Sequence, residues 1–337
     1  YYTDSSNNGY LSKSSYRTST YNLQQLLNYV KQFDKHEITA LLGHEYYNYK
    51  FEALSASGYN FGIDGIYELS TTLNKNNDPT SYSNAYNNEG FFFRGMYNYN
   101  QRYYGSLSFR RDASSRFVKD NRWGNFWSVG GAWIVSKESF FNAPQVNSLK
   151  VKLSVGSQGN DNIGDYLYAD SYNIVNNDNA VAYQWRQKGS EDITWETNIN
   201  WNGGLEFDLF NRRLNGSIDY FYRKTKDMLF SLDTPPSIGY TSYVTNLGDM
   251  RNSGVELALQ GILIDTKDFQ WDVNFNITHV KNKVLRLPES IKTMNIDGHD
   301  GYVNLDISFV SKYKYFIGEG LPLYTWYLPK FAGLDPD

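Results

Sequence analysis

Polar and apolar positions alternate along much of this chain with a period of two residues. The stretch LNGSIDYFYR at 214–223 divides into two sides: Leu214, Gly216, Ile218, Tyr220 and Tyr222 on one, and Asn215, Ser217, Asp219, Phe221 and Arg223 on the other. The same alternation recurs at 148–157 and 269–280. A period of two is that of a β-strand whose two faces meet different surroundings. The pattern therefore predicts strands, each with one apolar and one polar face.

Helical periodicity is almost missing beside this strand pattern. The best helical candidate is a short turn near 137–144, and residues 22–30 fit either period. Strand-like alternation is found in nine segments: 38–51, 89–100, 102–112, 125–136, 148–157, 195–210, 213–224, 253–264 and 269–280. Most of them reach the about 9–11 residues with which a tilted strand crosses a bilayer.

The connections between these segments alternate between short and long. The short ones lie at 33–36, 98–101, 211–213 and 265–268, with a somewhat longer one at 137–148; the long ones lie at 52–88, 158–194, 228–250 and 281–302. A transmembrane barrel has short periplasmic turns and long extracellular loops, whereas a soluble sandwich has no reason for such an alternation. The links therefore favour a barrel whose apolar face meets lipid.

Composition supports a surface rich in amphipathic rings. Aromatic residues make up 17% of the chain, with Tyr 30 and Trp 8, against a hydrophobic total of only 40%. Tyr and Trp suit membrane interfaces and ligand platforms, where one end of the ring is apolar and the other wet. The net charge of −4 gives no basic footprint, so we expect no nucleic-acid partner. Cysteine is absent, which excludes disulfide scaffolds and thiolate chemistry.

The sequence gives only weak indications of catalytic or metal-binding residues. The four histidines, His36, His44, His279 and His299, have no metal-binding spacing, and we expect no metal and no other cofactor. A glycosidase-like pair could be drawn from Glu206, Asp208 and Asp219, but these acids alternate with Asn and Ser, as a wet barrel interior does. Nucleophile and nucleotide motifs are missing, so an enzyme is not expected. Residues 159–165 and 295–301 resemble calcium loops in composition only, and turns are favoured there.

Aromatic residues in the long links are the remaining chemical signal. Candidates for cargo contact are Tyr183, Trp185, Tyr240 and Tyr243, and Tyr82 and Tyr86 are of the same kind. Such rings stack on sugars or on peptide side chains. The alternative is that they pack the loops or lie in an interfacial aromatic belt.

Five segments in order resemble a known family: 110–141, 195–229, 246–261, 269–287 and 319–337. They are similar to barrel segments of SusC/RagA-like, TonB-linked outer-membrane transporters of Bacteroidota. The resemblance implies a barrel of about 22 strands, the plugged transporter class. It also implies a plug domain, a TonB-contacting segment and a SusD-like surface lipoprotein over the mouth. Cargo in the family is an oligosaccharide or peptide, imported with energy supplied through TonB.

The expected fold is all-β, a partial antiparallel transmembrane β-barrel of roughly ten to twelve strands, about half of the full barrel. We expect residues 1–337 to form one partial TonB-dependent receptor β-barrel domain, without plug domain, signal peptide or linker, ending in a link at 333–337. Such a piece has two unpaired strand edges, so by itself it should neither transport nor insert stably. Candidates for the channel lining are Asn215, Asp219, Arg223, Asp272 and Asn274.

The leading hypothesis is the barrel portion of an active nutrient importer in the bacterial outer membrane, in contact with outer-membrane lipid, the TonB complex, a SusD-like lipoprotein and its cargo. One rival is a secreted or surface-bound soluble, aromatic-rich carbohydrate-binding β protein, whose apolar faces would be buried against each other. The other rival is a β-rich glycan hydrolase, for which the sequence offers no nucleophile or metal constellation.

Overall fold

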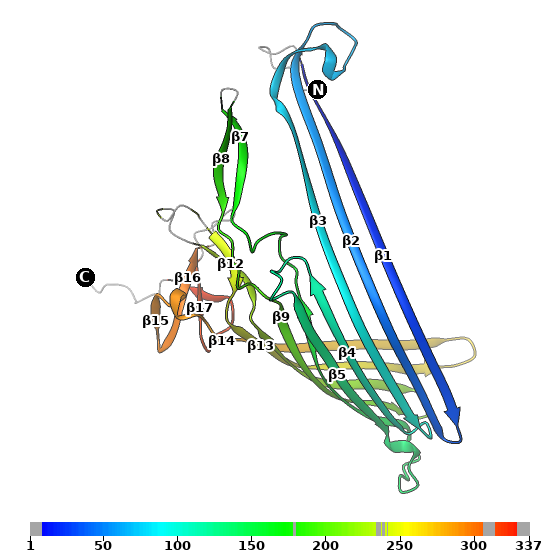
Figure 1. The fold of residues 1–337 in the computed structure, drawn as a ribbon. Helices are drawn as coiled ribbons and strands as arrows, with labels where there is room; N and C mark the ends of the chain where they lie inside the picture. Colours follow the sequence, from blue (N-terminus) through cyan, green and yellow to red (C-terminus); the bar gives the residue numbers. More distant parts are fainter. Residues whose placement is uncertain are drawn as a thin grey trace.

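The computed structural model describes residues 9–177, 180–233, 237, 240, 242–305 and 314–328, and it is built from strands (Figure 1). Ten strands form one antiparallel sheet: β1 (Tyr10–Phe33), β2 (His36–Phe61), β3 (Thr72–Tyr99), β4 (Tyr103–Ser114), β5 (Trp123–Ile134), β6 (Val146–Asn160), β9 (Glu196–Leu209), β10 (Leu214–Lys226), β13 (Asp249–Asp265) and β14 (Gln270–Arg286). Each strand pairs with the next in this order. The expected all-β, antiparallel partial barrel is confirmed.

Smaller elements lie in the links between these strands and in the segment after β14. They are the hairpin β7 (Ser171–Asn177) and β8 (Ala180–Gln187), the hairpin β11 (Leu229–Asp233) and β12 (Ser242–Asn246), the sheet β15 (Met294–Ile296), β16 (His299–Leu305), β17 (Lys314–Gly318) and β18 (Thr325–Tyr327), and the 3-10 turns η1 (Leu69–Thr71), η2 (Val135–Lys137) and η4 (Glu289–Ile291). Within the described ranges, no helix has the length and apolar character needed to cross a membrane.

The tight turns collect at one end of the sheet and the longer links at the other (Figure 1). The turns between β1 and β2, β3 and β4, and β9 and β10 use left-handed backbone, for example at Asp34 (φ 49°), Asn100 (φ 51°) and Asn211 (φ 56°). Asp and Asn tolerate this conformation better than most residues, which allows such short connections. The alternation of short and long connections is therefore confirmed, although one long link was misplaced.

That misplaced link is the one expected at 52–88. In the structure β2 continues to Phe61 and β3 begins at Thr72, so the connection covers only 62–71. The two strands stay paired through positions such as Tyr49↔Tyr86 and Leu54↔Ser81. Residues 22–30, which fitted either period, belong to β1, because their backbone pairs with β2 along its whole length. At 137–144 the structure has turns following η2, and the expected link at 333–337 lies outside the described residues.

The first three strands continue past the ends of β4, β5 and β6 (Figure 1). Pairing of β3 with β4 ends at Asn88↔Ser114, whereas β3 remains paired with β2 up to Thr72. We call this three-stranded extension, residues 10–21, 48–61 and 72–87, the wing. It lies at the end of the sheet opposite the tight turns.

Two hydrophobic clusters hold the links at the long-loop end. The first contains Phe117, Phe126, Ile193 and Trp195, with Ile163, Tyr168, Leu229 and Val244 packed against it. The second contains Val284, Leu287, Ile291 and Ile317, with Tyr302 and Leu323 beside it. The main sheet itself leaves large apolar side chains exposed, such as Ile218 at 44% and Trp201 at 54%. The two buried clusters therefore hold the links in place, whereas the main sheet leaves large apolar side chains exposed.

Candidate functional site

One face of the sheet carries a continuous apolar band, which we call the outer face. Phe93, Phe109 and Trp127 form one cross-strand row, since they are partners in register from β3 through β4 to β5, and all three are exposed. Ile218 and Tyr220 continue the face on β10. Residues opposite one another in an antiparallel sheet point to the same side. An exposed aromatic and aliphatic surface of this extent fits contact with lipid.

A ladder of rings borders the outer face at the tight-turn end. Phe33 stacks on His36 with ring centres 4.9 Å apart, and His36 lies 4.9 Å from Tyr99. Tyr103 stacks between Tyr99 and Trp133 at 6.2 Å and 6.4 Å. Such a girdle is found where a barrel leaves the hydrocarbon and enters the headgroup region.

A second group of rings borders the other end of the band. Phe91 stacks on Trp123 with a centroid distance of 6.4 Å, and the guanidinium of Arg111 lies over Trp123 at 5.1 Å. On β5 the two girdles are marked by Trp123 and Trp133, a separation that matches the about 9–11 residues of a tilted membrane-crossing strand. Above this level the outer face of β3 becomes polar, beginning with Glu89. The band is therefore one bilayer high.

The opposite face, which we call the inner face, carries ion pairs. Lys152 on β6 bonds to Glu206 on β9 and to Asp219 on β10, both at 2.9 Å, and Lys150 bonds to Glu206 at 3.0 Å. Gly204 lies between Lys152 and Asp219 in register, and a Cβ there would collide with the Asp219 carboxylate. Glu206 and Asp219, two of the three acids from which a glycosidase-like pair could be drawn, are thus both bound to a lysine.

The five residues expected to line the channel share this inner face. Asn215 and Asn274 belong to one cross-strand row, because each is paired with Gln260. Arg223 donates from Nε to Asn200 Oδ1 at 2.7 Å. Asp272 shares the face, two positions from Asn274 toward the tight turns. Their role in lining a channel remains a prediction, but the structure places them on the same side of the wall as Asp219.

A second charged group on the inner face was not among the candidates. Arg110 bonds to Asp112 at 2.7 Å and to Glu45 at 3.0 Å, and its guanidinium lies over the Phe92 ring at 5.0 Å. Arg110 and Asp112 are two positions apart, so a strand places them on one side. The spacing of Arg110 and Asp112 within FRRD at 109–112 could have indicated this pair from the sequence. Glu45 is far away in sequence, and no local pattern connects it with Arg110.

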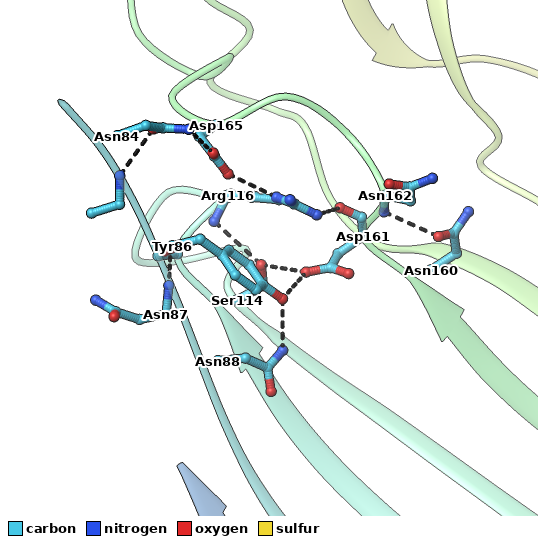
Figure 2. A network of polar contacts seen from close by, with 12 residues as sticks. Asn84, Tyr86, Asn87, Asn88, Ser114, Arg116, Asn160, Asp161, Asn162 and Asp165 are labelled. Carbon is cyan, nitrogen blue, oxygen red and sulfur yellow. Dashed lines mark hydrogen bonds and ion pairs between the residues drawn. The ribbon is translucent and has the colours of Figure 1, made fainter. Parts of the chain in front are cut away.

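A polar network joins the wing to two links (Figure 2). Tyr86 on β3 and Ser114 at the end of β4 both donate to Asp161 Oδ2, at 2.8 Å and 2.7 Å. Arg116 donates to Asp165 Oδ1 at 2.8 Å and to the Asp161 carbonyl at 3.0 Å. Burial and the Asp161 carboxylate raise the pKa of Tyr86, which lies beyond the membrane band, to about 12. Tyr86 therefore remains a hydrogen-bond donor at neutral pH.

This network occupies the segment at 159–165 whose composition resembled a calcium loop. The carboxylates of Asp161 and Asp165 accept hydrogen bonds from protein donors, and Asn84 also donates to Asp165. At 295–301 the chain forms the turn between β15 and β16, with left-handed backbone at Asp297. Across the described parts of the chain, no three His, Asp or Glu side chains are grouped as a metal would require.

The loop aromatics form two separate pairs on two hairpins. Tyr183 and Trp185 share one face of β8, and Trp185 packs edge-on against Tyr172 of β7 at 5.2 Å. Tyr183 is 73% exposed. Tyr240 packs edge-on against Tyr243, at the start of β12, at 6.1 Å. Both pairs lie at the long-loop end, the first sharing a strand face and the second in ring contact, and their contact with cargo remains a prediction.

An apolar outer face one bilayer high, a charged inner face, tight turns at one end and long links at the other define the wall of a transmembrane β-barrel. The sequence profile of the family "TonB dependent receptor-like, beta-barrel" matches residues 1–335, and the chain belongs to this family.

Similar proteins narrow the class further. The TonB-dependent receptor SusC of Bacteroides thetaiotaomicron is 37% identical over 221 residues, 62% of this chain and 22% of SusC. The TonB-dependent receptor P39 of Formosa agariphila is 32% identical over 279 residues, 79% of this chain and 26% of that receptor. The solved structure of the RagAB peptide transporter superposes with a TM-score of 0.86 at 28% identity, covering 97% of this chain and 35% of that one.

These relatives make the chain a barrel portion of a SusC/RagA-like receptor of the bacterial outer membrane. The chain spans between about a fifth and about a third of the length of the relatives it matches. They are receptors and transporters rather than enzymes. The outer-membrane location and the exposed apolar band do not fit the soluble carbohydrate-binding alternative.

Proposed function

We propose that this chain forms one side of the passage of an active importer, which takes up an oligosaccharide or a peptide across the outer membrane. The observation that carries the proposal is the ion-paired inner face, with Lys152 between Glu206 and Asp219, behind an outer face suited to lipid. A wall with these two faces separates hydrocarbon from a wet interior, as large barrels do. Polar cargo requires such an interior.

The energy source and the partners follow from the family. TonB-dependent receptors are named for the complex that we propose drives import, and RagAB, whose structure is similar, is a peptide transporter. We propose a SusD-like surface lipoprotein over the long-loop end. The exposed pair Tyr183 and Trp185 and the pair Tyr240 and Tyr243 lie at that end and offer rings for stacking on cargo or partner.

Uptake in the native host tests this function. Cells carrying the full-length receptor are given labelled oligosaccharides and labelled peptides, with and without a functional TonB complex. We expect uptake of one cargo class that is lost when either the receptor or TonB is removed. Asp219→Arg places a second cation beside Lys152 and should lower uptake, whereas Asp219→Asn, of nearly the same shape, should lower it less. Uptake that continues unchanged without TonB contradicts the proposal.

A further inference from the structure

The wing has its aromatic and charged sides reversed relative to the wall below it. Along β2 the inner side continues from Glu45 through Tyr47, Tyr49 and Phe51, and the outer side continues through Asn48, Lys50 and Glu52. The register between β2 and β3 has no shift from His36 to Ser55, so no bulge exchanges the two sides. Below the wing, rings such as Phe93 and Phe109 face outward to lipid, whereas the rings of β2 within the wing face the side of the passage.

Three inner-side rings contact one another across the wing, and we call them the aromatic platform. Tyr16 on β1 stacks on Phe51 on β2 with centroids 6.0 Å apart and planes at 18°, and Phe51 lies 5.8 Å from Tyr82 on β3. Tyr16 is 67% exposed and Tyr82 62% exposed. The platform lies above the upper girdle at Phe91, where lipid does not explain exposed rings.

The strand residues that surround the aromatic platform on the inner side are uncharged, and the charges beyond them, Arg116 and Asp165, are paired with each other. The neighbours of the platform in the inner-side rows are Ser14, Thr18, Ala53, Ser55, Thr80 and Asn84. The hydroxyls of Ser14 and Ser55 lie 2.9 Å apart and form a hydrogen bond. The charged strand residues at this level, Arg17, Lys50 and Glu52, lie on the outer side, where Lys50 bonds to Glu52 at 2.7 Å. The platform therefore offers ring faces and hydroxyls, with the charges of its own strands on the other side.

We infer that the aromatic platform is a binding site for a neutral oligosaccharide. The C–H faces of sugar rings would stack on Tyr16, Phe51 and Tyr82, while sugar hydroxyls exchange hydrogen bonds with neighbours such as Ser14 and Thr18. An anionic glycan would find the cation on this side, Arg116, already paired with Asp165, and a peptide would bring charged ends and side chains to a surface that offers no unpaired charge to them. The inference rests on the proposed import function, because the platform lies on the side that leads to the passage.

The chain supplies a matched control for this site. Tyr21 belongs to the same strand as Tyr16 and is 68% exposed, but it lies on the outer side. Both Tyr16 and Tyr82 are exposed, so their truncation leaves the fold in place. Tyr16→Phe and Tyr82→Phe keep the stacking faces and remove only the hydroxyls.

The experiment uses the full-length receptor in outer-membrane vesicles on an array of neutral oligosaccharides, uronate-containing oligosaccharides and peptides. We expect retention of neutral oligosaccharides, lowered about tenfold or more in the Tyr16→Ala/Tyr82→Ala variant and little changed in Tyr21→Ala or in the two Phe variants. The inference is wrong if the double variant binds neutral glycans as well as the unmodified receptor does. It is also wrong if the receptor binds only uronate-containing oligosaccharides or only peptides.

TonB-dependent uptake measured in the same strains separates this inference from the function it rests on. If uptake persists and the double variant binds neutral glycans normally, the platform is not the binding site, and the proposed import function still stands. Loss of TonB dependence removes the import function, whatever the array shows.

Discussion

The guanidinium carbon of Arg116 lies 4.2 Å from the centre of the Tyr86 ring. Tyr86 belongs to the wing and Arg116 to the link between β4 and β5, and both also bond to the link that follows β6, through Asp161 and Asp165 (Figure 2). Three segments that are distant in sequence therefore meet at one joint. The joint lies where the wing leaves the sheet, so it sets the position of the wing against the loops.

Substitutions at this joint should separate its two contributions. Tyr86→Phe keeps the ring under Arg116 and loses the hydrogen bond to Asp161, which we expect to cost about 1 kcal/mol. Arg116→Ala removes the ion-pair partner of Asp165, a carboxylate that is only 13% exposed and keeps the hydrogen bond from Asn84, and should cost about 2 kcal/mol. Hydrogen exchange of residues 161–170 in the full-length receptor measures both effects. Equal protection in the two variants contradicts this division.

The membrane band makes a prediction about two adjacent residues on β10. Ile218 faces outward among apolar side chains, and Ser217 faces the inner side. Ile218→Lys places a cation against lipid and should destabilise the folded barrel by about 2–4 kcal/mol if the residue lies near the midplane. Ser217→Lys puts the same side chain in the wet interior and should change stability little. Folding of the full-length receptor into vesicles, titrated with denaturant, tests the pair, and similar losses would show that the faces are assigned wrongly.

A clamp between two links can be tested at Asn246. Its side-chain amide donates to the carbonyls of Thr194 at 2.9 Å and Asp227 at 2.7 Å, and its oxygen accepts from the Thr194 amide at 2.7 Å. Asn246→Ala leaves the two partly buried backbone groups of Thr194 and the exposed carbonyl of Asp227 without this partner, at a cost of about 1–3 kcal/mol. We expect faster amide exchange at Thr194 while the exchange of β9 and β10 stays as in the unmodified protein. Unchanged exchange at Thr194 would mean that the clamp holds nothing in place.

The strands of the wall could be predicted from the sequence because lipid imposes an alternation that water does not. Ile218 and Tyr220 alternate with Ser217 and Asp219, and the structure has this strand with these faces. Most of the wing could not be predicted as strand, because water surrounds both of its sides. Beyond the strand expected at 38–51, polar residues such as Glu52 and Ser81 have the composition of a loop, although the backbone continues its ladder.

In the candidate site, too, local alternation predicted the face of a residue but not its partners from other strands and links. The face of Asp219 followed from the period of two, but its partner Lys152 came from another strand and could be paired with it only through the register. The hairpin that carries Tyr183 and Trp185 was read as part of one long link, because its two strands are short. The network around Asp161 depends on three links folding against each other, which no local pattern encodes.

The base of the β7–β8 hairpin should depend on pH. The backbone N–H of Gly189 donates to Asp170 Oδ1 at 2.8 Å, and Lys188 bonds to the same oxygen at 3.2 Å. These donors, the Gly189 amide first, lower the pKa of Asp170 below its ordinary value of 3.8. A carboxyl whose pKa is lower in the folded state stabilises the fold above its ordinary pKa, and this contribution is lost as the pH falls through the lowered value.

We therefore expect the Gly189 amide to lose protection when the full-length receptor is taken from about pH 5 to about pH 2, measured by hydrogen exchange and corrected for the intrinsic rate. Asp170→Asn supplies the matched control, because its carbonyl still accepts from the Gly189 N–H but does not titrate. In this variant protection should be the same at both ends of the range. A fall of equal size in the variant would assign the pH dependence to another group and leave Asp170 without a role in closing the hairpin.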